Sequence, residues 1–457
     1  MKPGRATRLL PAVPVCLSLL IAPDSLASNG MNMIGYGARS CSMAGADLAI
    51  ADGPSAMNIN PAGIGRGQYR ELALGLSEMR PSVTHADRLG NDGGDVLDRY
   101  PIPFLGYIHP LGRITLGAGF FVQGGMGAEY EDLSTPFSVM AASAPAGFFD
   151  GDVVPAGDAA LSSFMHAKFT PTVAWRVTET LIVGAGVNVS YARAAMKLFP
   201  GTSVVADLDG SGTAGDSPGD AFFGMDARDM SDIAYGLRLG LQYQVGSLRF
   251  GGGYCTRTSL DLDGGTTTLN LSAQGLGEVD YDARMTGFAW PRTVNMGMAY
   301  QVSPRVLLVG DVDWVNWSNA IETITIEIDN PDHPMAPASR EIPMAMDWND
   351  QWVFALGMEV MASPTWALRF GYNHGKAPVP DSRLRPMFPA IAEDHIAGGV
   401  GKISGPWTFD VGLEYAIENE MTNDSPDRSV NPFGSGSRES VSQFMVHFMV
   451  RRTLSLP

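Results

Sequence analysis

The sequence predicts an all-β protein: a transmembrane antiparallel β-barrel of about fourteen strands, with a small N-terminal hatch that plugs the lumen. Three observations support this prediction. Many segments of ten or more residues alternate between apolar residues and small or polar ones. Short turns and long polar loops connect these segments in alternation. Residues 28–68, which precede the first of them, show neither a strand pattern nor a helix pattern.

The N-terminus is typical of a secretory signal peptide. A basic stretch with Lys2, Arg5 and Arg8 precedes the apolar residues 9–21, and small residues then offer a cleavage site. We therefore expect residues 1–27 to be removed on export to the outer membrane of a Gram-negative cell. No later apolar run reaches the roughly eighteen residues of a membrane-spanning helix, which excludes a helical membrane protein.

The composition limits the partners. The formal net charge is −17 at pH 7, which argues against nucleic acid because nucleic acid selects basic surfaces. The two cysteines that follow the signal peptide, Cys41 and Cys255, are too few for a disulfide framework, and we expect them not to pair.

The strand pattern is clearest in "DIAYGLRLGLQYQV", residues 232–245. One face carries Ile233, Tyr235, Leu237, Leu239, Leu241, Tyr243 and Val245, and the other carries Ala234, Gly236, Arg238, Gly240, Gln242 and Gln244. The same alternation recurs in residues 180–192 and 407–417. Strands of soluble sheets average about five or six residues, whereas longer strands with aromatic ends fit a bilayer-spanning strand tilted by about forty degrees. We therefore expect the apolar face to meet lipid and the small polar face to line the interior.

The connections indicate the same architecture. Short turns are expected at residues 109–112, 176–179, 245–247, 302–304, 362–364 and 404–406. Long loops rich in Gly, Pro and Asp are expected at about residues 81–99, 125–163, 194–229, 263–290, 319–349, 375–393 and 419–438. Six turns and seven loops join fourteen strands, and an even number places both chain ends on the periplasmic side. A closed barrel also leaves no unpaired backbone edge in lipid.

The expected organisation is therefore a signal peptide at 1–27, a hatch at 28–68 and an outer-membrane barrel with long extracellular loops at 69–457. A barrel of this circumference has an open lumen unless a segment fills it. The hatch is rich in Gly, Ala and Ser, which suit close packing against an inner wall, and Pro54 and Pro61 supply turns.

Several motifs resemble the FadL/TodX family, the outer-membrane transporters of long-chain fatty acids and hydrophobic compounds. "GARSCSMAGADLAIADGPSAMNINPAGI" (residues 37–64) resembles the hatch signature of that family, with its A-x-A-D step and its N-P-A-G end. "DMSDIAYGLRLGLQYQ" (229–244), "WPRTVNMGMAYQVSPRVLLVGDVDWVNWS" (290–318) and "YNHGKAPVPDSRLRPMFPAIAEDHIAGGVG" (372–401) are similar to its later segments, in the same order. The chain departs from the family pattern at its end, because it continues to Leu456-Pro457 beyond the aromatic residues of the last strand. The sequence therefore does not determine which C-terminal residue the barrel-assembly machinery recognises.

The resemblance implies passive uptake of a long-chain fatty acid or another hydrophobic small molecule. The ligand would be caught between the outward loops, bound in the lumen and released sideways through the wall as the hatch shifts. Asn60, Pro61 and Ala62 are the hatch residues expected to act in gating. We expect a monomer without a cofactor, surrounded by outer-membrane lipid and lipopolysaccharide.

Nine apolar residues of two long loops are candidates for ligand contact, because a solvated loop has no need of them. They are Phe137, Met140, Phe148, Phe149, Leu198, Phe199, Phe222, Phe223 and Met225. Packing on one another as a lid is the other interpretation of this set. Gly124-Gly125 is either a kink in the third strand or the start of a loop.

Other candidate sites are weaker. Asp207, Asp209 and Ser211 have the spacing of a calcium loop, but Pro218 stands where such a loop has Glu, so a flexible acidic loop explains them better. Arg238 and Arg369 are expected to face the lumen, where they either meet a substrate carboxylate or form ion pairs with wall carboxylates. The seven histidines are scattered without metal-ligand spacing.

No catalytic motif is present: the sequence has no G-x-S-x-G, no H-E-x-x-H and no Ser/His pair at the predicted rim. We therefore expect a protein without enzymatic activity and without a metal. A non-transporting barrel that binds or adheres to a protein or a surface is the alternative function.

Overall fold

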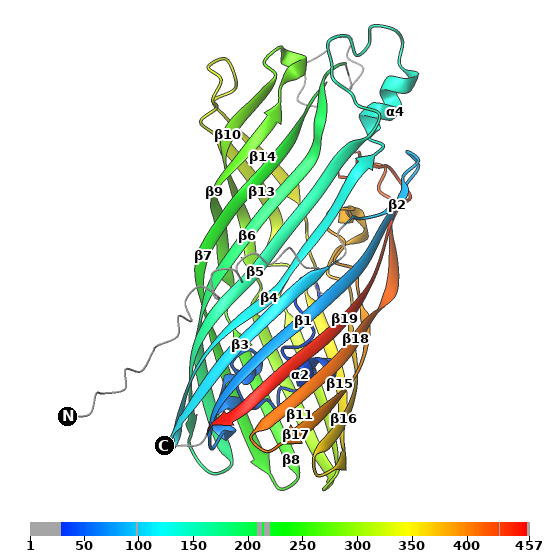
Figure 1. Ribbon diagram of the computed structural model, residues 1–457. Coiled ribbons are helices and arrows are strands. Elements are labelled where there is room, and N and C mark those ends of the chain that lie inside the picture. Colours follow the sequence, from blue (N-terminus) through cyan, green and yellow to red (C-terminus); the bar gives the residue numbers. More distant parts are fainter. Residues whose placement is uncertain (1–28, 97–98, 208–212, 214–219, 429, 455–457) are drawn as a thin grey trace, which may run out of the picture.

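The computed structural model describes residues 29–96, 99–207, 213, 220–428 and 430–454. They form a tall antiparallel barrel with tilted strands (Figure 1). The predicted signal peptide lies outside the described residues. Within the described part of the chain, no helix is long and apolar enough to span a membrane.

Nineteen strand segments make up one sheet. They are β1 (Arg70–Ala86), β2 (Asp92–Gly94), β3 (Tyr100–Leu111), β4 (Ile114–Leu133), β5 (Asp158–Arg176), β6 (Leu181–Val205), β7 (Ala221–Val245), β8 (Leu248–Cys255), β9 (Thr258–Asn270), β10 (Glu278–Trp290), β11 (Thr293–Ser303), β12 (Val306–Val315), β13 (Ile321–Asp329), β14 (Ser339–Ala345), β15 (Gln351–Ser363), β16 (Trp366–Gly375), β17 (Asp394–Ser404), β18 (Trp407–Asn423) and β19 (Ser437–Leu454).

Four pairs of these segments are single wall strands with an interruption. The four pairs are β8/β9, β10/β11, β12/β13 and β14/β15. β7 pairs with both β8 and β9, and on the other side β8 pairs with β11 and β9 with β10. In the same way β12 pairs with β11 and β15, and β13 pairs with β10 and β14. β2 is a short strand at the end of β1. The described wall therefore has fourteen strands, and β1 pairs with β19 along its whole length to close it. The predicted fold class is confirmed.

The orientation of the strands also agrees with the sequence pattern. The predicted lipid-facing residues of β7 are all exposed, and their exposed fractions lie between 41% for Leu241 and 69% for Tyr235. Arg238 and Gln242 on the other face are buried. On β18, Leu413 and Tyr415 are exposed and the interior Asp410 and Glu414 are buried. An apolar outer face is what a bilayer requires, since charged groups on that face are costly.

All six predicted short turns lie where they were expected, but the loops at the opposite end are shorter than predicted. β6 continues to Val205 and β7 begins at Ala221, so much of the predicted loop 194–229 is strand. Beyond the bilayer a wall strand needs no apolar outer face, although its backbone groups still pair. The sequence alternation therefore fades before the strand ends.

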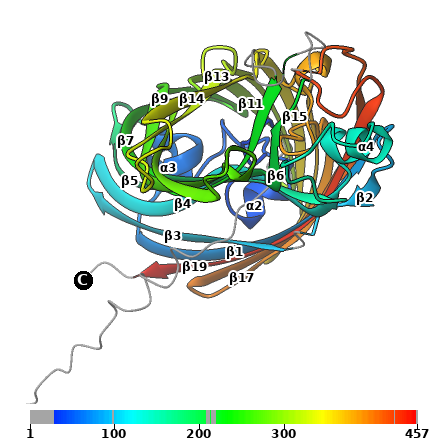
Figure 2. The ribbon, with the colours of Figure 1, turned by 90° about the horizontal axis from the view of Figure 1, so that it is seen from above.

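The N-terminal segment lies inside the barrel. It contains three short helices, α2 (Ala38–Cys41), α3 (Ala56–Ile59) and the 3₁₀ helix η2 (Pro61–Arg66). Figure 2 shows α2 and α3 within the ring of strands. We call residues 29–66 the hatch. At the opposite end of the barrel, the loops contain α4 (Pro136–Ser143), η4 (Ser272–Gln274) and η5 (Asp381–Arg383).

Candidate functional site

Asn60 fastens the hatch to the wall. Its side chain is fully buried, and its Nδ2 donates hydrogen bonds to the carbonyl oxygens of Leu48 and Leu241, each at 3.0 Å. Its Oδ1 accepts a hydrogen bond of 3.2 Å from the amide of Ala62, which caps η2. One side chain thus joins two segments of the hatch to β7.

Two glycines allow the Asn60 turn to rest directly on the wall. Gly184 of β6 and Gly240 of β7 face each other in the sheet. A Cβ on Gly184 would lie 2.4 Å from the amide nitrogen of Ala62, and a Cβ on Gly240 would lie 2.1 Å from Asn60 Oδ1. Any larger residue at either position would push this part of the hatch away from the wall.

Ion pairs hold a second part of the hatch. Arg39 Nη1 lies 2.9 Å from Asp52 Oδ2, and Arg39 Nε lies 3.1 Å from Glu359 Oε2 on β15. Arg451 of β19 lies 2.8 Å from Asp52 Oδ1. Burial raises the pKa of Asp52, but the guanidinium groups of Arg39 and Arg451 lower it by more, so the carboxyl group stays ionised. The two arginines therefore tie the hatch to two distant parts of the wall.

The lumenal arginines Arg369 and Arg238 differ in their contacts. Arg369 lies 2.7 Å from Glu359 Oε2 and 2.7 Å from Asp410 Oδ1, so it serves an ion-pair network. Arg238 donates one hydrogen bond of 3.1 Å to the carbonyl oxygen of Ile59. Within the described residues its Nε has no hydrogen-bond partner. Arg238 is therefore only partly satisfied by the protein.

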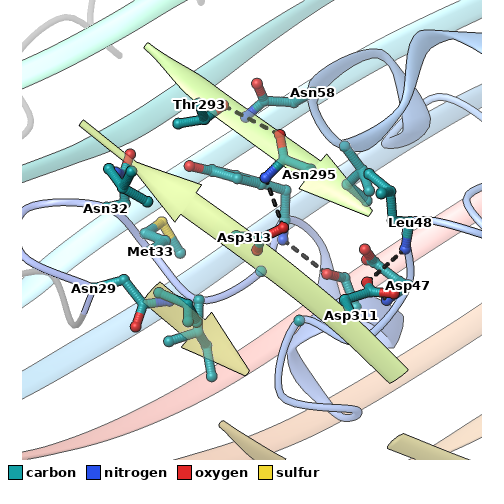
Figure 3. Close-up of a pocket in the computed structure, with 18 of the residues that line it drawn as sticks. Asn29, Asn32, Met33, Asp47, Leu48, Asn58, Thr293, Asn295, Asp311 and Asp313 are labelled. Carbon is teal, nitrogen blue, oxygen red and sulfur yellow. Dashed lines mark hydrogen bonds between the residues drawn. The ribbon is translucent and has the colours of Figure 1, made fainter. Parts of the chain in front are cut away.

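A polar cavity with about 650 Å³ of space lies between the hatch and the wall (Figure 3). Asp311 Oδ2 accepts hydrogen bonds from the amides of Asp47 and Leu48, at 2.6 and 2.8 Å. Asn295 donates to Asp313 Oδ1 at 2.7 Å. Burial raises the pKa of Asp47 to about 7, and the nearby Asp313 carboxylate acts in the same direction. The three carboxyl groups that line this cavity, those of Asp47, Asp311 and Asp313, make it a poor match for a hydrophobic ligand.

A second cavity, apolar and with about 450 Å³ of space, lies between the hatch and the outer loops. Its lining consists of Met31, Met126, Ser162, Ser163, Phe164, Ala194, Ala195, Met196, Met285, Phe288, Ile321, Ile324, Met346, Trp348 and Phe388. These residues come from the hatch, from the five wall segments β4, β5, β6, β10 and β13, from the break between β14 and β15 and from one outer loop. None of the lining residues is charged. The lining is that of a site for a small hydrophobic ligand.

Three tryptophans form a row at the interruptions of the wall. Trp290 ends β10, Trp317 lies between β12 and β13, and Trp348 lies between β14 and β15. Neighbouring rings meet edge to face, with centroids 6.0 and 5.2 Å apart. Trp290 Nε1 donates a hydrogen bond of 3.1 Å to Oδ1 of Asn32 in the hatch. The row therefore connects the lining of the apolar cavity to the hatch.

A loop closes the apolar cavity on the outer side. Residues 376–393 fold into the lumen, and Leu384, Met387 and Phe388 are buried there. Asn423 Nδ2 donates a hydrogen bond of 3.0 Å to the carbonyl oxygen of Leu384, and Ser162 Oγ donates to that of Met387. A ligand that enters from outside must displace or pass this loop.

Lys168 is a buried lysine near the apolar cavity. It lies on the interior face of β5, is 3% exposed, and has no hydrogen bond or ion pair within the described residues. Lys168, Arg238 and Trp290 line one small polar pocket together with Asn32. Met31, the residue before Asn32, lines the apolar cavity. The two sites thus adjoin.

The wall has a gap beside the hatch. β3 and β4 pair only as far as Phe104 and Phe121, after which β3 pairs with β1 alone and β4 with β5 alone. Gly124 of β4 lies at a β-bulge and forms a bridge with Asn32 of the hatch. The Gly124-Gly125 pair is therefore a kink inside a strand and not the start of a loop.

This gap connects the lumen with the lipid-facing surface. It is lined by Met33 and Tyr36 of the hatch, by Pro103 and Val122 of the two strands, and by outward-facing residues such as Leu76, which is 49% exposed. The lining is largely apolar. The pocket in the gap thus has hatch residues on one side and outward-facing residues on the other.

The nine predicted contact residues do not form one site. Phe199 and Met225 are buried, and Phe137, Phe199 and Phe222 form a cluster with ring centroids 4.6 and 6.0 Å apart. Phe148 and Phe149 contact each other near the loop tip, with ring centroids 4.9 Å apart. Leu198 and Phe223 pack at the edge of the same core, and Met140 lies on α4. The set lies above the apolar cavity and none of its members lines it.

Two further expectations can be placed. Cys41 and Cys255 are both buried and free, as expected. Asp207 follows the end of β6, whereas Asp209 and Ser211 lie outside the described residues, so the calcium candidate stays a prediction. The sequence analysis did not identify Lys168. The alternation of the strand around it could have placed it on the interior face.

A family model described as "Outer membrane protein transport protein (OMPP1/FadL/TodX)" matches residues 20–445 of the chain. The chain is 34% identical over 112 residues to an uncharacterized protein of Chlorobium limicola from the 5′ region of the phosphoenolpyruvate carboxykinase gene. That match covers 24% of this chain and 53% of the relative, so the chain spans about half the length of that curated relative.

Solved structures share the fold. The toluene transporter TodX of P. putida superposes with a TM-score of 0.74 at 19% identity, and the match covers 93% of this chain and 100% of TodX. The toluene transporter TbuX of Ralstonia pickettii gives a TM-score of 0.68 at 23% identity, covering 92% and 99%. A FadL homologue of Pseudomonas aeruginosa gives 0.70 at 16% identity, covering 93% and 100%.

Proposed function

We propose that this chain, which belongs to the OMPP1/FadL/TodX family of outer membrane transport proteins, carries long-chain fatty acids across the outer membrane. Family membership makes it an outer-membrane transporter of hydrophobic compounds. The proposal concerns the substrate and the route. It is supported by one arrangement: an uncharged apolar cavity that adjoins the buried, unpaired ammonium group of Lys168.

A fatty acid matches both parts of this arrangement. Its hydrocarbon chain gains about 0.8 kcal/mol for each methylene group that leaves water, and the apolar cavity offers it Met, Ile and aromatic contacts. Its carboxylate needs a cation in a buried site. Lys168 and the partly satisfied Arg238 supply two.

The proposed route has three steps. A ligand is first held by the apolar side chains of the outer loops, such as Phe148 and Phe149. It then passes the loop at 376–393 into the apolar cavity. Movement of the hatch, held by Asn60, Pro61 and Ala62 against the wall, next opens the path to the gap between β3 and β4. Lateral exit suits an apolar solute because it avoids water altogether.

A neutral aromatic hydrocarbon is the second candidate substrate. The apolar cavity itself contains no charged residue, and two of the solved structures with this fold are described as toluene transporters. In that case Lys168 would have no role in the substrate's binding, which is the difference that an experiment can detect.

Binding and uptake of three compounds separate these candidates: oleate, its methyl ester and toluene. We expect oleate to enter cells with the protein faster than cells without it. Lys168→Met should weaken oleate binding by about tenfold or more, the loss of one buried charge pair, and should leave methyl oleate unaffected. Lys402→Met is the matched control, because Lys402 is exposed and its Nζ stacks on Trp366 at 4.6 Å.

Each outcome has a clear meaning. Toluene uptake that does not depend on Lys168, with no uptake of oleate, would favour the hydrocarbon channel. If no compound enters faster in the presence of the protein, transport itself is refuted and the non-transporting binding or adhesion barrel is left.

A further inference from the structure

The contact between α2 and the wall contains a cluster of ionisable side chains that the proposed transport route does not use. α2 packs against β17, β18 and β19, where Gly399 and Gly412 face each other in the sheet. A Cβ on Gly399 would lie 2.0 Å from Ser42 Oγ, so this close approach depends on glycine. The helix ends at Cys41, whose thiol is fully buried against these strands.

Three metal-binding side chains meet at this contact. The donor atoms of Cys41, Glu414 and His447 all lie within 4.8 Å of one another, and each side chain is buried. His447 Nε2 lies 3.1 Å from Glu414 Oε2. The other ring nitrogen, Nδ1, forms a hydrogen bond of 2.8 Å with Ser77 Oγ. Ser77 therefore fixes the ring with Nε2 turned toward the thiol and the carboxylate.

His395 is a second buried histidine beside Glu414. It is fully buried, and within the described residues neither of its ring nitrogens makes a hydrogen bond of normal geometry. Its Nδ1 lies 3.4 Å from Glu414 Oε1. A buried imidazole without a hydrogen bond of normal geometry is costly, and such groups in native proteins usually meet an ion or a water molecule.

The set of donors selects the kind of ligand. One thiol, one imidazole and one carboxylate meet here, and all three are groups that bind Zn²⁺ in tetrahedral sites. Ca²⁺ and Mg²⁺ prefer six or more oxygen ligands, and only Glu414 offers oxygen here. A divalent cation would also compensate the negative charge of Glu414, which is otherwise buried beside neutral or weakly basic groups.

We propose that Cys41, Glu414 and His447, with His395 beside Glu414, form a site for a divalent transition-metal ion, best matched by Zn²⁺, that ties the hatch to the barrel wall. Cys41 comes from the hatch and the other three residues from three neighbouring wall strands. A bound ion therefore links the plug to the wall and holds it in its docked position. The site is independent of the substrate that the barrel carries.

Cobalt binding tests the site directly. The full-length protein, purified without a histidine tag and stripped with a chelator, is titrated with Co²⁺ and followed by absorption. We expect one equivalent to bind with a thiolate-to-cobalt charge-transfer band in the near ultraviolet, and added Zn²⁺ to abolish the band. Cys41→Ser should remove the charge-transfer band.

Cys255→Ser is the matched control. Cys255 is also buried and free, but its thiol lies 3.6 Å from the amide nitrogen of Asn188 and belongs to none of the metal-binding groups among the described residues. This variant should keep the band. His395→Gln and His447→Gln should each weaken Co²⁺ binding, and heat-modifiable migration on a gel checks that each variant is folded.

Two results would overturn the proposal: no saturable Co²⁺ binding by the stripped protein, or a charge-transfer band that persists in folded Cys41→Ser. Either would leave a hydrogen-bonded His447–Glu414 pair without a metal. A second readout is conductance in planar bilayers, which Zn²⁺ should lower in the wild type and in Cys255→Ser but not in Cys41→Ser.

Discussion

The indole Nε1 of Trp290 donates a hydrogen bond of 3.1 Å to Oδ1 of Asn32. Trp290 ends the wall segment β10 at an interruption, and Asn32 belongs to the hatch and also bridges Gly124 at the edge of the gap. One hydrogen bond therefore joins the row of tryptophans, the hatch and the gap. A shift of this part of the hatch must break it.

Trp290→Phe tests this connection. The substitution keeps an aromatic ring in the row but removes the donor, which leaves Asn32 Oδ1 with only the Gln123 amide at 3.2 Å. Docking of the hatch should weaken by about 1 kcal/mol, seen as a higher open probability in planar-bilayer recordings. An unchanged open probability would show that this hydrogen bond does not hold the hatch.

Asn60→Ala tests the main anchor. It leaves the carbonyl oxygens of Leu48 and Leu241 without the Asn60 amide, at a cost of about 1–3 kcal/mol to hatch docking. We expect altered uptake in a barrel that still migrates as heat-modifiable. Gly240→Val should act in the same direction by displacing the turn, because its Cβ would overlap Asn60. Normal uptake by both variants would exclude gating by this turn.

Met196→Trp tests the apolar cavity. The larger side chain should occupy the space that the ligand needs and should lower uptake about tenfold or more, while overpacking costs the barrel only about 1–3 kcal/mol. Leu237→Trp is the control, since Leu237 is 51% exposed on the lipid-facing side. Equal uptake by the two variants would place the binding site elsewhere.

The hatch is expected to respond to pH through Asp47, whose pKa is raised to about 7 by burial. The docked state thus binds a proton more tightly than an exposed Asp does, so docking is strongest at acid pH. It weakens as the pH rises from about 4 toward 7, the range between the ordinary and the raised pKa. Bilayer conductance should therefore increase over this range, and Asp47→Asn should flatten the dependence. A profile unchanged in Asp47→Asn would assign the pH response to another group.

The barrel was predictable because a bilayer imposes one rule on every strand. Lipid requires apolar residues such as Tyr235 and Leu237 on the outer face, and strict alternation with Ala234 and Arg238 then fixes the inner face. The ends of β6 and β7 were not predictable, because above the bilayer that rule no longer applies.

The cavities were harder to foresee because their residues meet only in the closed barrel. Met31, Phe164 and Trp348 are far apart in the sequence, and nothing local marks them as neighbours. The same is true of His395, Glu414 and His447, which show no metal-ligand spacing along the chain. They meet because β17, β18 and β19 are adjacent and because Gly399 and Gly412 admit the hatch helix.

The central claim is that the ligand leaves sideways through the gap between β3 and β4. A disulfide across the gap tests it most directly, with cysteines in place of Pro103 and Val122, which line the opening on its two sides. The control pair, Tyr107→Cys and Ala118→Cys, cross-links positions of the same strands that are already paired.

We predict that oxidation of the Pro103→Cys/Val122→Cys variant reduces oleate uptake to the level of cells without the protein, and that a reductant restores it. The control pair should transport equally well in both redox states. Full uptake through a barrel whose gap is quantitatively cross-linked would contradict lateral exit at this position.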